Sequence, residues 1–80
     1  MKTEEIRMTL SILNMLDAKA RITPKSAKMK PFISLVNDFD FTGGVSKVIL
    51  GACEESIFPD GNKESYTMLL TDIKKVDKYE

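Results

Sequence analysis

Two short apolar segments flank a run of turn-forming residues in the second half of the chain. Residues 45–50 and 66–71 are rich in valine, isoleucine, threonine and other strand-forming residues. Between them, Pro59-Asp60-Gly61-Asn62 has the composition of a tight turn. The pattern predicts an antiparallel hairpin after a chain break at Gly43-Gly44. Because a two-stranded ribbon is marginal in water, helices must cover one face, and residues 73–79 or a second copy of the chain could add a strand.

Residues 3–20 have the composition of a helix. Thr3 is a suitable N-cap, two glutamates follow where the helix dipole favours acids, and Leu, Met, Lys and Ala are common in the remainder. At about 100° per residue, Arg7, Ser11 and Asn14 form one narrow polar strip, and apolar side chains cover most of the rest. Such a wide apolar arc predicts a helix that is packed on two sides, or one that keeps a face for a partner.

The same segment has a competing interpretation as a strand. Between Ile6 and Ile12, apolar and polar residues alternate, which is the period of a half-buried strand. The length and composition of the segment favour the helix. We therefore predict a helix and keep a strand over residues 5–13 as the alternative.

A second helix is predicted from Pro31 to Phe39. Thr23-Pro24 has the features of a helix start, but Pro31 would disturb a helix interior, so we expect a short turn first. One apolar face with i, i+3, i+4 and i+7 spacing is formed by Phe32, Leu35, Val36 and Phe39. The predicted fold class is α+β, with two helices packed on an antiparallel β-hairpin or small antiparallel sheet.

The length and charge of the chain limit the number of domains and the kinds of partner that we expect. The 80 residues include 12 basic and 12 acidic residues, one cysteine and no histidine. They suit a single domain, residues 1–80, whose modest core needs oligomerisation or a partner for further stability. The charge balance lacks the basic footprint of a nucleic-acid binder, so we expect no direct nucleic-acid contact. Without a recognisable signal peptide or membrane span, we expect a cytoplasmic protein that contacts no membrane.

The charges are nevertheless separated along the chain. A basic stretch runs from Lys19 to Lys30, and the acidic stretch from Asp38 to Asp60 is interrupted only by Lys47. This separation indicates either two solvated faces of opposite sign or an acidic docking face.

Groups that carry catalysis are scarce. Without histidine, a Ser–His or Cys–His nucleophile cannot be assembled within one chain. Gly43-Gly44 lacks the spacing of a phosphate-binding motif, and the acids from Glu54 to Asp60 lack that of a calcium loop. Cys53, at the end of an apolar strand, is interpreted as a small buried hydrophobe. We therefore predict no enzymatic activity, no cofactor and no metal.

Residues 54–58 combine two carboxylates and a hydroxyl with two apolar side chains. Such a mixture suits recognition, because the carboxylates can take the place of phosphate oxygens while Ile57 and Phe58 supply an apolar anchor. The alternative is an ordinary hairpin end with solvated acids, whose apolar side chains fold back onto the core.

Glu55-Ser56-Ile57 and Met68-Leu69-Leu70-Thr71 resemble segments of the phage-type uracil-DNA glycosylase inhibitors, which are DNA mimics. In that family a Glu-Ser-Ile edge enters the DNA cleft of the enzyme, and an apolar pocket captures the leucine that the enzyme inserts into the duplex. The resemblance implies that the first segment is the edge and that Met68 and Leu70 line the pocket, with Asp72 as an approximate match to a following acid. A rival alignment places the edge at Ser11-Ile12-Leu13. Because the net charge is zero, the mimicry would be local.

The expected function is a protein inhibitor, from a phage or mobile element, that blocks a DNA-processing enzyme, most concretely uracil-DNA glycosylase. Its partner-binding residues would be Glu54, Glu55, Ser56, Ile57, Phe58, Met68, Leu70 and Asp72. The alternatives are a small homodimeric structural or adaptor module, paired through the first helix or a strand edge, and an inhibitor of another host protein.

Overall fold

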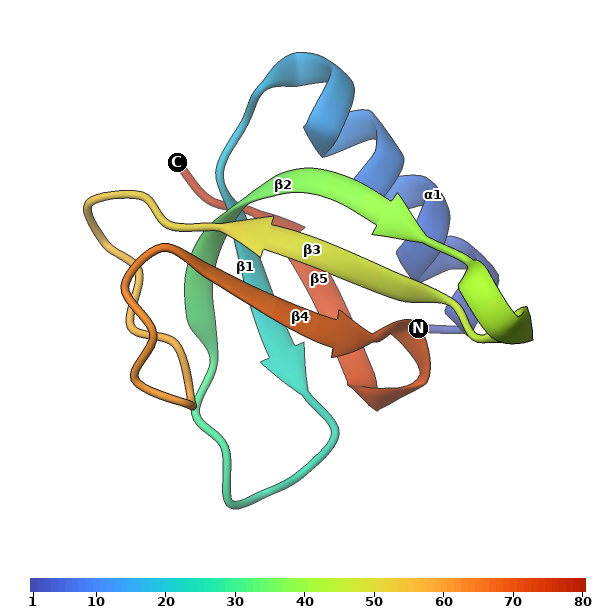
Figure 1. Cartoon of the computed structure of the whole chain (residues 1–80). Coiled ribbons are helices and arrows are strands. Elements are labelled where there is room, and N and C mark those ends of the chain that lie inside the picture. Colours follow the sequence, from blue (N-terminus) through green and yellow to red (C-terminus); the bar gives the residue numbers. More distant parts are fainter.

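The computed structural model describes all 80 residues and contains one α-helix and one five-stranded sheet (Figure 1). The helix is α1 (Thr3–Leu16), and the strands are β1 (Ala20–Pro24), β2 (Phe32–Asp40), β3 (Lys47–Gly51), β4 (Ser65–Leu69) and β5 (Ile73–Lys78). Two short 3-10 helices, η1 (Thr42–Gly44) and η2 (Leu70–Asp72), follow β2 and β4.

The sheet is antiparallel throughout and has the order β4-β3-β2-β1-β5. Strands β1 to β4 form a meander, and η2 then leads the chain back so that β5 pairs with β1. Strand β2 pairs with β1 through its first residues and with β3 from Leu35 onward, with an irregularity between Val36 and Asp38. Figure 1 shows the resulting curvature of β2, the long strand that joins the two halves of the sheet.

The core is one apolar cluster between α1 and the sheet. From the helix, Ile6, Leu10 and Leu13 are buried, as the spacing of one helical face requires. The rest of the cluster is Ala20, Ile22, Phe32, Val36, Val48, Leu50, Phe58, Met68, Leu70, Ile73 and Val76. Every strand therefore contributes, and burial of these side chains is the main stabilising contribution.

The prediction of an N-terminal helix is confirmed, and the alternative of a strand over residues 5–13 is wrong. The helix begins at Thr3, so the N-cap is Lys2 and not Thr3 as predicted. The Lys2 N–H donates to the Glu5 carboxylate at 3.2 Å. It ends at Leu16 and not near Ala20, because Asp17 takes a left-handed conformation with φ of 52°. The Asp17 N–H donates to the Asn14 carbonyl at 3.1 Å, which satisfies one of the last free carbonyls of the helix.

The second predicted helix, Pro31–Phe39, is wrong, because this segment forms β2. Positions i and i+4 share a face in a strand as well as in a helix, so the burial of Phe32 and Val36 fits both. Ser34, between them, is also buried, whereas Leu35 is only half-buried. The burial therefore has the period of two, and the fold class is α+β with one helix.

The predicted hairpin is confirmed as β3 and β4, which pair in the register Val48 to Met68 and Leu50 to Tyr66. The tight turn is Phe58–Gly61, with the Gly61 N–H donating to the Phe58 carbonyl at 3.0 Å. A strand is also present where residues 73–79 allowed one. It extends the sheet at β1, on the side away from the hairpin.

Candidate functional site

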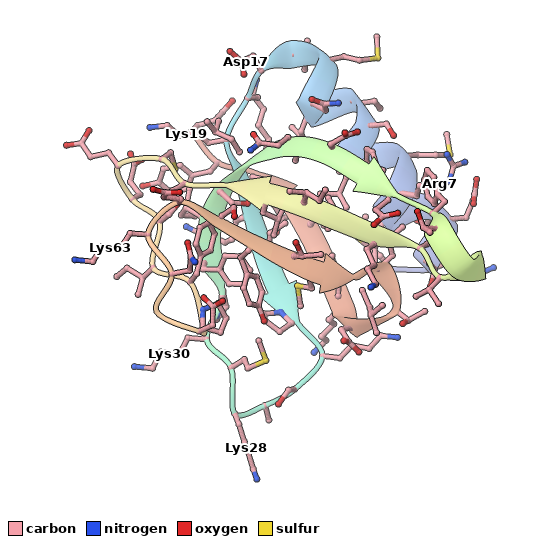
Figure 2. All side chains as sticks on the ribbon, in the orientation of Figure 1. Arg7, Asp17, Lys19, Lys28, Lys30 and Lys63 are labelled. Carbon is pink, nitrogen blue, oxygen red and sulfur yellow. The ribbon has the colours of Figure 1, made fainter.

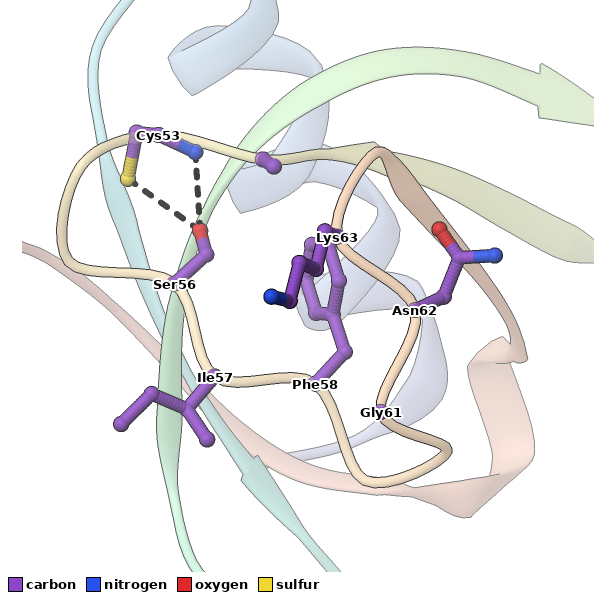
Figure 3. A pocket seen from close by; sticks show the side chains of 8 residues that line it. Cys53, Ser56, Ile57, Phe58, Gly61, Asn62 and Lys63 are labelled. Atoms are coloured by element: carbon purple, nitrogen blue, oxygen red, sulfur yellow. Dashed lines mark hydrogen bonds between the residues drawn. The ribbon is translucent and has the colours of Figure 1, made fainter.

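Most of the predicted binding residues lie in the loop from Ala52 to Glu64, which joins β3 to β4. The loop encloses a concave pocket of about 330 Å³ whose lining includes Cys53, Ser56, Ile57, Phe58 and Lys63 (Figure 3). In that view the ring of Phe58 points into the loop and Ile57 points outward. The loop is thus a folded substructure, and each of its side chains has a distinct role.

Ser56 fastens the loop to the sheet. Its hydroxyl donates to the Ile33 carbonyl of β2 at 2.6 Å and accepts the Cys53 N–H at 2.9 Å. The Cys53 Sγ lies 3.3 Å from the same oxygen, and the thiol is half-buried. Both hydrogen-bonding directions of the hydroxyl are therefore used within the chain.

Glu55 forms an ion pair with Lys19, the residue before β1. The Lys19 Nζ lies 2.8 Å and 2.9 Å from the two carboxylate oxygens. This hydrogen bond lowers the pKa of Glu55 below its ordinary value and raises the pKa of Lys19. The ion pair neutralises one of the two negative charges of the predicted acidic edge. The other, on Glu54, is exposed and unpaired.

The two apolar residues of the predicted edge have opposite environments. Ile57 is 83% exposed, whereas Phe58 is 4% exposed. The Phe58 ring packs edge-on against Phe32, with 5.7 Å between centroids, and stacks on Tyr66 at 5.8 Å. The interpretation of Phe58 as an exposed anchor is therefore wrong, and Ile57 alone is available to a partner.

The other predicted residues do not meet this loop in one site. Leu70 is 1% exposed and Met68 is 5% exposed, so both belong to the core. Met68 borders a separate groove of about 340 Å³, together with Lys25, Met29, Tyr66 and Asp72. No pocket of the structure joins Met68 or Asp72 to Ile57.

A third concave area lies on the other side of Ile57. It has a volume of about 380 Å³ and is lined by Lys28, Lys30, Pro31, Ile57, Phe58 and Pro59. The sequence shows a basic stretch here, but its contact with the loop at Ile57 depends on how the β1–β2 and β3–β4 connections meet. Local sequence patterns could not predict that contact.

The outer face of α1 carries an exposed apolar stripe, which consists of Met8, Ile12, Met15 and Leu16. These side chains are 54%, 54%, 84% and 61% exposed. At about 100° per residue they span an arc of about 100°, on the side of the helix away from the buried Ile6 and Leu10. The wide apolar arc seen in the sequence thus resolves into two faces, one packed on the sheet and one open.

The sheet has two open edges, and they differ. On β5 the edge carries exposed Lys74, Lys75 and Lys78, and the amino group of Met1 donates to the Lys74 carbonyl at 3.3 Å. The β4 edge has no charged residue in its five positions. Lysines on an edge strand oppose pairing with another chain, so β5 is protected and β4 is not.

No family model, curated protein or solved structure matches the chain. No group of three or more His, Cys, Asp or Glu side chains is arranged to hold a metal ion. No helix has the length and apolar character needed to cross a lipid bilayer.

Proposed function

We propose that this chain is a small interaction module that forms a homodimer through the apolar stripe of α1. The observation that carries the proposal is the exposure of Met8, Ile12, Met15 and Leu16 side by side on one face of the helix. Isolated apolar side chains on a surface are ordinary, whereas a contiguous apolar patch larger than a few hundred Å² is typical of an interaction site.

A second copy of the chain is the occupant that the stripe fits best. In an antiparallel, two-fold pairing centred on Ile12, Met8 of one copy faces Leu16 of the other. A two-fold interface needs such self-complementarity, because each copy presents the same surface.

Size also supports self-association. An 80-residue chain buries a smaller share of its surface than a larger domain, and a dimer adds buried apolar area without lengthening the chain. Full burial of an apolar side chain stabilises by about 1.5–3 kcal/mol. Each stripe side chain is more than half exposed, so more than half of that contribution is still available on burial in an interface. The β4 edge offers less, because Ser65 and Thr67, two of its five residues, are exposed polar positions.

Glycosylase inhibition stays a prediction, with less support from the geometry. Glu55 is paired with Lys19, and Phe58, Met68 and Leu70 are core residues. Glu54 and Ile57 remain free in the loop, and Asp72 is exposed but borders the separate groove. A uracil-excision assay with a bacterial glycosylase and excess protein tests it. Undiminished excision would end the inhibitor hypothesis, whereas inhibition that Glu54→Ala with Ile57→Ala relieves would support it.

Sedimentation velocity over a concentration series tests the homodimer. The proposal predicts a shift from monomer to dimer as concentration rises, and a variant with a charge at Ile12 should remain monomeric.

A further inference from the structure

Ile57 stands between two concave areas of the surface. The pocket enclosed by the β3–β4 loop and the groove beside the β1–β2 connection both include Ile57 and Phe58 in their linings. Phe58 forms a buried base, whereas Ile57 projects with 83% of its surface exposed. An exposed isoleucine flanked by two hollows has the shape of an apolar anchor that a partner can surround.

Three lysines and no acid line these two areas. Lys28 and Lys30 border the groove, and Lys63 borders the pocket. Figure 2 shows all three extending outward on the same side of the molecule. None of them takes part in an ion pair, although four ion pairs form elsewhere on the chain. The four acids of the same loop line neither area; they are Glu54, Glu55, Asp60 and Glu64.

We infer that this surface, formed by Lys28, Lys30, Ile57 and Lys63, binds an acidic peptide segment of a partner protein. Carboxylates of the segment pair with the lysines, and an apolar side chain packs beside Ile57 against Pro31 and Pro59. The surface is separate from α1, which Figure 1 shows at the upper right, whereas the β1–β2 and β3–β4 connections lie at the bottom and left of the view. Dimerisation and peptide binding are therefore independent.

A peptide fits these features better than a single-stranded nucleic acid does. Nucleic-acid grooves combine basic side chains with exposed aromatic rings on which bases stack. Here the nearest rings, Phe58 and Tyr66, are buried and half-buried, and the exposed element is aliphatic. Because its net charge is zero, the chain also has no general electrostatic attraction for the phosphates of a nucleic acid.

The test is titration of the full chain with a fluorescent synthetic peptide in which one central leucine is flanked by glutamates. A matched peptide with glutamine at each glutamate is the first control, and an oligothymidylate of similar length is the second. We expect saturable binding of the acidic peptide and of neither control. In NMR titrations of the labelled protein, the amide shifts should be largest around Lys28, Lys30 and Ile57.

Variants locate the contact. The double change Lys28→Glu with Lys30→Glu, and separately Ile57→Ser, should each weaken binding by about tenfold or more, which corresponds to about 1.4 kcal/mol. Lys74→Glu with Lys75→Glu on β5 makes the same charge change at a distance and should weaken it far less. No saturable binding, equal binding of the glutamine peptide, preference for the oligonucleotide, or equal loss in the β5 variant would each overturn the inference.

Discussion

The Ser56 hydroxyl donates a hydrogen bond of 2.6 Å to the Ile33 carbonyl, 23 residues earlier in the chain. This bond and the Cys53 N–H that the same oxygen accepts tie the β3–β4 loop to the middle of the sheet. The loop therefore holds Ile57 in a fixed place beside the lysines of the β1–β2 connection.

Loss of the Ser56 hydroxyl should destabilise the fold. In Ser56→Ala, a part-buried carbonyl and a part-buried N–H lose their partner, and each such loss costs about 1–3 kcal/mol. We expect the free energy of unfolding, measured in urea, to fall by about the sum of the two losses, with a correspondingly lower midpoint. Ser65→Ala is the matched control, because its side chain is exposed at the start of β4 and should change stability by less than about 0.5 kcal/mol. Equal midpoints for the two variants would contradict the fastening role.

The ion pair between Glu55 and Lys19 predicts how stability depends on pH. Since folding lowers the pKa of Glu55, its contribution is present above the ordinary value of 4.5 and is lost as the pH falls through the folded pKa. Since folding raises the pKa of Lys19, its contribution is present below the ordinary value of 10.5 and is lost as the pH rises through the folded pKa. Urea unfolding at acid, neutral and alkaline pH measures both.

Lys19→Met should remove the alkaline part of that dependence, because the titrating amine is gone. It should reduce the acid part, because the Lys19 hydrogen bond is the largest of the contributions that lower the pKa of Glu55. Lys75→Met is the control, because its ion pair with Asp77 is exposed and longer, at 3.4 Å. If Lys19→Met followed the parent chain at every pH, the ion pair would have no influence on stability.

Ser34 should be replaceable without loss. Its side chain is fully buried on β2, and its Oγ has no hydrogen-bond partner. An unpaired buried hydroxyl carries its full desolvation cost, so Ser34→Ala should leave stability unchanged or raise it by up to about 1 kcal/mol. Thermal unfolding by circular dichroism measures this. A clear decrease in the melting temperature would mean that the hydroxyl has a partner.

Local patterns predicted those elements whose signals are local. The helix predicted over residues 3–20 and the hairpin around Pro59-Asp60-Gly61 depend on composition and turn chemistry. Both are present, although the helix ends at Leu16. The helix predicted from Pro31 to Phe39 was wrong because Phe32 and Val36 share a face in a helix and in a strand. Only the burial of Ser34 distinguishes the strand.

The site depends on contacts between residues that are far apart in the sequence, and local patterns cannot predict such contacts. Lys19 and Glu55 are separated by 36 positions. Phe58 and Ile57 are neighbours and both apolar, and the packing of Phe58 on the distant Phe32 and Tyr66 distinguishes the buried residue from the exposed one. For that reason the segment from Glu54 to Phe58 could be selected from the sequence, while its exposed and buried members could not be separated.

The homodimer through α1 is tested most directly by sedimentation equilibrium of the parent chain, Ile12→Glu and Val45→Glu. Both substitutions replace an exposed apolar residue, which is 54% exposed at Ile12 and 43% exposed at Val45, but only Ile12 lies in the stripe. The parent and Val45→Glu should dimerise alike. Ile12→Glu places two carboxylates at the two-fold axis, and an unpaired buried charge costs about 3–5 kcal/mol, so its dimer should weaken by at least about a hundredfold. A parent chain that stays monomeric up to about millimolar concentration, or an Ile12→Glu dimer as strong as the parent's, would contradict the account.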